Sequence, residues 1–239
     1  MNEILQVAML AGQMILENGG ETYRTEETIV HIAKALGAKT ASAFVTPTVI
    51  MFSYTDDDDH YHSAIKRVTK SSVNLQKVSQ VNNLARRLER RKITSNPKQV
   101  EALLERIEKA PKNPNWLICL GASLNSFCFA FMFGGKFIEA IFAFIIGLLL
   151  RISLIGIDKF SLNSFVTSIF AGAFIALLAT PLQFLSPIIS VEISTFIVMI
   201  ATLMQVVPGL AIVNGIRDII SGDLVSGTAR IMDAFMTAA

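Results

Sequence analysis

The chain has 239 residues, of which 52% are hydrophobic and only 17% are charged, and its mean hydropathy is +0.51. Soluble domains carry about 25% charged residues, so the composition excludes a simple water-soluble enzyme, a disordered chain and a secreted disulfide scaffold. The net charge of +2 is too small and scattered for a nucleic-acid surface. The charges are unevenly divided, because 29 lie in residues 1–115 and only 11 in residues 116–239. We therefore predict a small soluble-type domain over 1–115 and a transmembrane domain over 116–239.

The first 37 residues predict two helices. Apolar residues recur at helical spacing over 3–17, and Gly19-Gly20 follow as a stop. Thr22 is the expected N-cap of a second helix, which Gly37 ends. Charged side chains crowd the first turn of that helix, namely Glu21, Arg24, Glu26 and Glu27. This cluster either complements the helix dipole or forms a docking or gating surface.

The rest of the first half predicts two strands and two more helices. Residues 43–54 are β-branched and aromatic and predict one strand, in which Pro47 favours an edge position or a bulge. Residues 63–69 predict its partner strand. Helices are expected over 72–92 and again from Asn96-Pro97, where Asn caps the helix and Pro takes its first position. The domain is therefore expected to be a small α+β module.

An acidic loop between the two strands is the most conspicuous cluster of possible ligands. It reads Asp56–Asp59, His60, Tyr61 and His62. Carboxylates and imidazoles could hold a divalent metal, but Asp is also a favoured turn residue. We expect a solvated hairpin tip without a metal. Since the chain has no P-loop, Cys-x-x-Cys, Gly-x-Ser-x-Gly or His-Glu-x-x-His motif, we expect no catalytic residue and no cofactor.

Apolar runs in the second half predict about five transmembrane helices. A span needs about 20 residues to cross the hydrocarbon core. The expected spans lie near 116–135, 137–153, 161–180, 188–207 and 224–239. The last would give only about 24 Å of helix, which is short of a full span.

The basic residues between these spans alternate in a way that predicts orientation. Lys and Arg favour the cytoplasmic side of a membrane. One side carries Arg106, Lys109 and Lys112 before the first span, Arg151 and Lys159 after the second, and Arg217 after the fourth; the other carries Lys136 alone. We therefore expect a multi-pass protein of the cell membrane (plasma or inner membrane) with its N-terminal domain in the cytoplasm.

The most informative stretch follows the fourth expected span. Pro208-Gly209 interrupts the apolar run, and a helix broken at membrane depth must face protein or a water-filled cavity. Half-helix ends and freed carbonyls bind polar solutes in secondary transporters. Five polar or charged residues follow at once: Asn214, Arg217, Asp218, Asp223 and Arg230. They either belong to a solute path or form a cytoplasmic loop that only orients the chain. Arg217 could pair with Asp223, or Arg230 with Asp218.

Two stretches resemble the threonine/serine exporter family. One is the run from Asn18 to Thr48, with NGGETYRTEETIVHIAKALG and VTPT; the other combines Pro208-Gly209, Gly215-Ile-Arg217-Asp218, Gly222-Asp223, Ser226-Gly227 and Arg230. The resemblance implies a cytoplasmic domain, about five membrane helices, and export of small hydrophilic metabolites. Long members carry a second five-helix half. This chain therefore resembles one subunit of a split exporter, whose partner would be a small hydrophobic membrane protein.

The resemblance and the polar positions together give two sets of candidate residues. The expected substrate path and coupling residues are Asn125, Gln205, Pro208, Gly209, Asn214, Arg217, Asp218, Gly222, Asp223, Gly227 and Arg230. The expected family motif of the cytoplasmic domain is Glu21, Thr22, Arg24, Glu27, Thr46, Pro47 and Thr48.

Three functions follow from these observations. The first is export of threonine or serine across the cell membrane, with a small-molecule substrate, the lipid bilayer and a second subunit as partners. Export of a succinate-like dicarboxylate is the alternative within transport. A membrane-anchored hydrolase that uses residues 1–115 is the second function, and a scaffold subunit that only holds its partner is the third.

Overall fold

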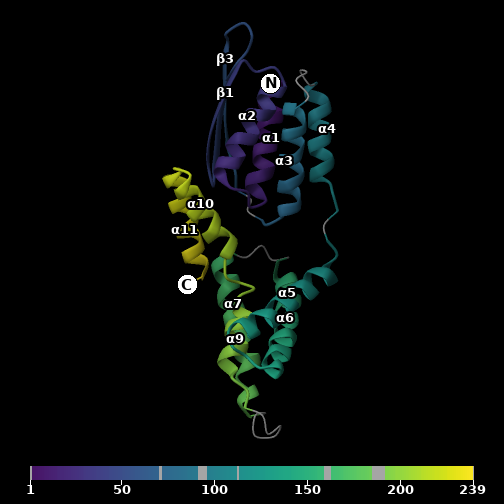
Figure 1. The fold of residues 1–239 in the computed structure, drawn as a ribbon, viewed down its shortest axis with the longest axis vertical. Helices are drawn as coiled ribbons and strands as arrows, with labels where there is room; N and C mark the ends of the chain where they lie inside the picture. The colour runs from purple at the N-terminus through teal and green to yellow at the C-terminus, as the bar shows by residue number, and fades with distance from the viewer. Residues whose placement is uncertain are drawn as a thin grey trace. The chain divides into compact units, whose positions relative to one another are not determined.

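The computed structural model describes residues 2–69, 72–90, 96–111, 113–158, 163–184 and 192–238, which form two compact units (Figure 1). The first unit contains Met1–Pro111 together with Gly209–Ala234, and the second contains Lys112–Pro208 together with Phe235–Ala239. The C-terminal segment thus belongs to the same unit as the N-terminal helices. The division into a cytoplasmic domain over 1–115 and a membrane domain over 116–239 stays a prediction.

Four helices of the first unit confirm the helical pattern expected from the sequence. They are α1 (Glu3–Glu17), α2 (Thr22–Ala35), α3 (Leu75–Arg90) and α4 (Pro97–Glu108). The expected cap of α4 is present, because the side chain of Asn96 accepts a hydrogen bond from the Lys98 amide at 3.0 Å. Large apolar side chains of all four helices are fully buried in one core, among them Ile15, Ile29, Val81 and Leu104.

The sheet of the first unit corrects the strand prediction. It has three antiparallel strands in the order β1 (Thr40–Thr46), β2 (Val49–Thr55) and β3 (Tyr61–Arg67). The single strand expected over 43–54 is wrong, because Pro47 lies in a turn between two strands. Proline has no amide hydrogen for the ladder, so the strand ends there, and Thr46 pairs with Val49 across the turn.

One face of this sheet is buried and the other is open. Val45, Ile50 and Phe52 are at most 2% exposed, whereas Phe44 and Met51 are more than 40% exposed. This is the period-two alternation of a sheet that covers a core on one side only. The buried face packs on α1 and α2, which places the β1–β2 turn within the unit that holds the N-terminal motif.

The second unit is built from apolar helices: α5 (Asn115–Met132), α6 (Phe137–Ile157), α7 (Ser164–Ala179) and α9 (Thr195–Leu203). Among the described residues, three helical segments are long and apolar enough to cross a membrane, namely Asn115–Met132, Phe137–Ile157 and Ser164–Phe184. They match the first three expected spans. The fourth expected span lies partly outside the described residues, and its described helix has only nine. Five spans are therefore not confirmed.

Glu139 in the first turn of α6 is buried in spite of its charge. It is 3% exposed, and its carboxylate accepts the backbone N–H groups of Lys136 at 2.5 Å and of Ser194 at 2.6 Å. The carboxylate therefore satisfies free amides at the start of α6 and just before α9.

The last two helices form a hairpin, which belongs to the first unit as far as Ala234. They are α10 (Gly209–Ile220) and α11 (Leu224–Ala238), joined by a turn in which Gly222 has φ +97°. The helices approach closely at Gly215 and Gly227: a Cβ atom on Gly227 would lie 2.6 Å from the carbonyl oxygen of Gly215. Only glycine allows this crossing, which positions the polar side chains of both helices.

Candidate functional site

The turn between α1 and α2 leaves backbone groups without local partners. Gly19 adopts φ +84°, in the left-handed region that favours glycine, and the Gly20 amide donates back to Ile15 at 2.9 Å. The residue before α2 is Glu21, so Thr22 is the first helical residue and not the expected cap. Glu21 makes no side-chain cap. The first amides of α2 and the carbonyls of the turn must therefore find partners elsewhere.

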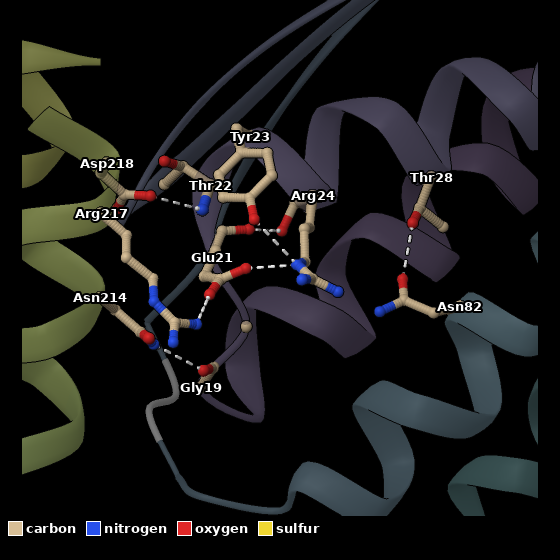
Figure 2. Close-up of polar contacts among 12 residues, drawn as sticks. Gly19, Glu21, Thr22, Tyr23, Arg24, Thr28, Asn82, Asn214, Arg217 and Asp218 are labelled. Carbon is tan, nitrogen blue, oxygen red and sulfur yellow. Dashed lines mark hydrogen bonds and ion pairs between the residues drawn. The ribbon is translucent and has the colours of Figure 1, made fainter. Parts of the chain in front are cut away.

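Helix α10 supplies two of these partners, as Figure 2 shows. The carboxylate of Asp218 accepts the Thr22 amide at 3.2 Å, and the side-chain amide of Asn214 donates to the Gly19 carbonyl at 2.9 Å. Asp218 is completely buried. A carboxylate at the positive end of a helix is stabilised by the helix dipole, so Asp218 caps α2 from a distance of 196 residues along the chain.

Helix α11 adds a buried cation to the same turn. Arg230 forms an ion pair with Asp218, whose closest atoms are 3.1 Å apart, and the Arg230 guanidinium donates to the Gly20 carbonyl at 2.7 Å. The Arg230 side chain is only 11% exposed. The predicted pairing of Arg230 with Asp218 is confirmed. Since both charges are buried, each depends on the other for compensation.

Glu21 is the centre of a second pair of contacts. Its carboxylate forms ion pairs with Arg217 of α10 and with Arg24 of α2. Burial would raise the pKa of Glu21, but the hydrogen bond from Arg217, the one with Tyr23 and the nearby positive charges lower it below the ordinary value. Glu21 is therefore held ionised. Arg217 pairs with Glu21 and not with Asp223, which corrects the alternative pairing considered above.

A third contact joins α11 to the sheet. The hydroxyl of Ser226 is buried and donates to the Val45 carbonyl at 3.0 Å, while the Val45 amide donates to Glu26 at 2.7 Å. Burial raises the pKa of Glu26; the bond from Val45 opposes this, and the charges of Asp223 and Asp218 add to it. The sequence prediction did not single out Ser226 as a site residue, and Glu26 was only part of a charged cluster.

The other predicted motif residues lie outside the contacts described so far. Thr46, Pro47 and Thr48 form the end of β1 and the turn after it. Glu27 lies on the exposed side of α2, 3.5 Å from His31, and does not contact the hairpin. Gly209 begins α10 directly after Pro208, so the expected helix break is present.

We use the name motif network for one set of contacts. It comprises the contacts of seven residues with one another and with the backbone groups they bind: Glu21, Thr22, Asn214, Arg217, Asp218, Ser226 and Arg230.

The remaining candidates lie in the second unit. The Gln205 amide donates to the Ser126 hydroxyl at 2.7 Å, so Gln205 meets α5 through Ser126 and not through the predicted Asn125, which is half-buried beside it. Ser126 is completely buried. The polar contact within this apolar bundle was missed at Ser126 because a single serine in a long apolar run carries no distinctive spacing.

The acidic loop forms the tip of the β2–β3 hairpin. Asp56 accepts the amides of Asp58 and His60 and lies 2.8 Å from the ring of His62, and Asp59 has φ 62°. Ligand atoms of Asp56, Asp58 and His60 lie within 4.8 Å of one another. The internal hydrogen bonds are those of a tight turn. They account for Asp56, and the expectation of no metal stays a prediction.

Comparisons with known proteins identify the class. The family model described as "Putative threonine/serine exporter" matches residues 6–239. The chain therefore belongs to the threonine/serine exporter family. This is a family of transporters, in keeping with the three apolar helices of the second unit.

Two relatives are similar over nearly the whole chain, and both are named "Probable succinate transporter subunit YjjP". The protein from Klebsiella aerogenes is 25% identical over 90% of this chain and 81% of its own length. The protein from Escherichia coli K12 is 23% identical over 95% of this chain and 86% of its own length. No solved structure matches the chain.

Proposed function

We propose that the chain is one subunit of a secondary exporter that moves small carboxylate-bearing metabolites out of the cytoplasm, with a succinate-like dicarboxylate as the first candidate solute. The observation that carries this proposal is the family match over residues 6–239. The choice of a dicarboxylate is supported by the names of both relatives. Threonine or serine is the second candidate, supported by the description of the family.

The proposed arrangement places residues 1–115 in the cytoplasm and the apolar helices across the cell membrane. Both relatives are named as subunits, which supports a partner subunit. We propose that this partner is a small hydrophobic membrane protein that supplies the other half of the exporter. Transport forms and breaks no covalent bond in the solute. The proposed function therefore needs no catalytic residue and no cofactor.

The motif network changes the role proposed for its charged residues. Arg217, Arg230 and Asp218 were candidates for direct contact with solute, but in the structure each is paired within the protein. We propose that they act by holding the hairpin of α10 and α11 against the turn before α2. On this view export depends on the network as a unit, whichever solute is carried.

Transport by the purified proteins tests the proposed function. The full chain is reconstituted in liposomes alone and with its partner, and release of labelled succinate, threonine and serine is measured. We expect release of succinate at least tenfold above protein-free liposomes, only when both subunits are present. Release of threonine and serine without succinate would exclude the dicarboxylate as the solute. No release of any of the three would contradict the exporter function.

A further inference from the structure

A polar contact lies inside the second unit, where its surroundings are apolar. The Gln205 amide and the Ser126 hydroxyl are 2.7 Å apart, and Ser126 is completely buried. Large apolar side chains dominate the helices around them. Burying an amide and a hydroxyl costs free energy unless their hydrogen bonds are satisfied, so any hydrogen-bonding group that this contact leaves unsatisfied needs another partner.

Gly147 of α6 makes room for this contact. A Cβ atom on Gly147 would lie 2.4 Å from the Gln205 side-chain nitrogen and 2.8 Å from the Ser126 hydroxyl. These separations are shorter than van der Waals contact, so any larger residue would displace the pair. The three residues come from α5, from α6 and from the segment after α9. Three parts of the second unit therefore meet at one polar point.

Two buried polar atoms of the second unit, one of them in this contact, have no hydrogen-bond partner among the described residues. One is Oε1 of Gln205 and the other is Nε of Arg151. Arg151 lies four residues after Gly147 in α6, and residues with this spacing share a helix face. It also lies about 9 Å, or six residues, before the end of α6 at Ile157. Arg151 is thus a cation within a membrane-crossing helix, on the face that meets Gln205.

A cation inside an apolar helix favours an anionic ligand. Charged residues inside spans are costly and mark ligand or ion paths, and among the described residues no carboxylate pairs with Arg151. A guanidinium binds a carboxylate through two parallel hydrogen bonds. A serine hydroxyl both donates and accepts. After a half-turn of the Gln205 amide, Ser126 can donate to Oε1 of Gln205, and the NH2 group of Gln205 is then free to donate to the same carboxylate.

We propose that Arg151 and Gln205 form a carboxylate-binding site inside the second unit, with Ser126 and Gly147 as positioning residues. The site rests on the proposed function and deepens it, because it names the group of the solute that the protein binds. Succinate, threonine and serine all carry a carboxylate, so this site serves either candidate solute. Arg151 supplies the charge, and Gln205 supplies a neutral hydrogen bond from the neighbouring segment.

Replacement of Arg151 separates binding from orientation of the chain. Arg151→Lys keeps the positive charge that orients α6 but loses the two parallel hydrogen bonds. We expect at least a tenfold higher half-saturating concentration of labelled succinate in liposomes that contain both subunits. Arg151→Gln is expected to lose more than nine-tenths of transport. Lys136→Gln, at the other end of the same helix, is the matched control and should stay within twofold of the wild type.

A second readout does not depend on transport. Succinate is expected to raise the melting temperature of the purified two-subunit complex, and Arg151→Lys should need at least tenfold more succinate for the same rise. Wild-type behaviour of Arg151→Lys in both assays would overturn the site and leave the exporter intact. If wild-type protein neither releases nor is stabilised by any of the three solutes, the proposed function itself fails, and the site fails with it.

Discussion

Asp218→Ala is expected to destabilise the protein by about 3–5 kcal/mol and to remove more than nine-tenths of export. The substitution deletes the buried partner of Arg230, so a guanidinium that is only 11% exposed is left without its counter-charge. It also removes the acceptor of the Thr22 amide at the start of α2. Thermal unfolding of the purified complex and succinate release from liposomes measure the two effects.

The acidic hairpin tip provides the control for this substitution. Asp57→Ala removes a carboxylate of the same kind from an exposed position, and surface substitutions of this type usually change stability by less than about 0.5 kcal/mol. Asp57→Ala should therefore match the wild type in both assays. Equal melting temperatures for Asp218→Ala and Asp57→Ala would show that the buried ion pair does not hold the hairpin in place.

Gly227→Ala is expected to separate α10 from α11. The added Cβ atom would lie 2.6 Å from the Gly215 carbonyl oxygen and 2.9 Å from the Ile219 amide nitrogen. Because backbone atoms cannot move aside as a flexible side chain can, the two helices must shift. Overpacking of this kind costs about 1–3 kcal/mol. The shift also displaces the neighbouring Ser226 from Val45, so both the melting temperature and the export rate should fall.

Gly121→Ala is the matched control for the hairpin crossing. Gly121 also lies within a helix, but outside its own stretch of helix no atom of the described residues lies within 4 Å of the position that its Cβ would take. Alanine is about 1 kcal/mol more favourable than glycine inside a helix, so Gly121→Ala should keep or slightly raise the melting temperature. The two Gly→Ala substitutions are expected to change the melting temperature in opposite directions, and this difference tests the close crossing of α10 and α11. A Gly227→Ala protein as stable as the control would contradict it.

The parts of the fold set by local sequence were predicted well. The spacing of apolar residues gave α1 to α4, and Asn96-Pro97 gave the start of α4. The strand count was wrong at Pro47, where a run of β-branched residues hides a turn. Three spans follow from length and hydropathy alone. Hydropathy did not foresee that α9 has only nine helical residues among those described.

The sequence predicted which residues belong to the candidate site better than it predicted how these residues contact one another. The resemblance marked both Glu21 and Arg217, but the two are 196 residues apart in sequence. Spacing rules describe neighbours on one helix or strand. The pair of Arg230 and Asp218 could therefore be proposed only as one of two possible pairs. The pair of Arg217 and Glu21 could not be proposed at all. Arg151 was interpreted as a marker of orientation, because only the placed helices show that its Nε is buried without a partner among the described residues.

A double-mutant cycle between Glu21 and Arg217 tests the central claim most directly. That claim is that the two family motifs, far apart in sequence, act as one network. Glu21→Gln, Arg217→Gln and the double variant are compared by melting temperature and by succinate release from the two-subunit liposomes. Residues that contact each other are non-additive in such cycles. We predict that each single substitution impairs the protein and that the double variant is no worse than the more severe single one. Effects that simply add would contradict the network.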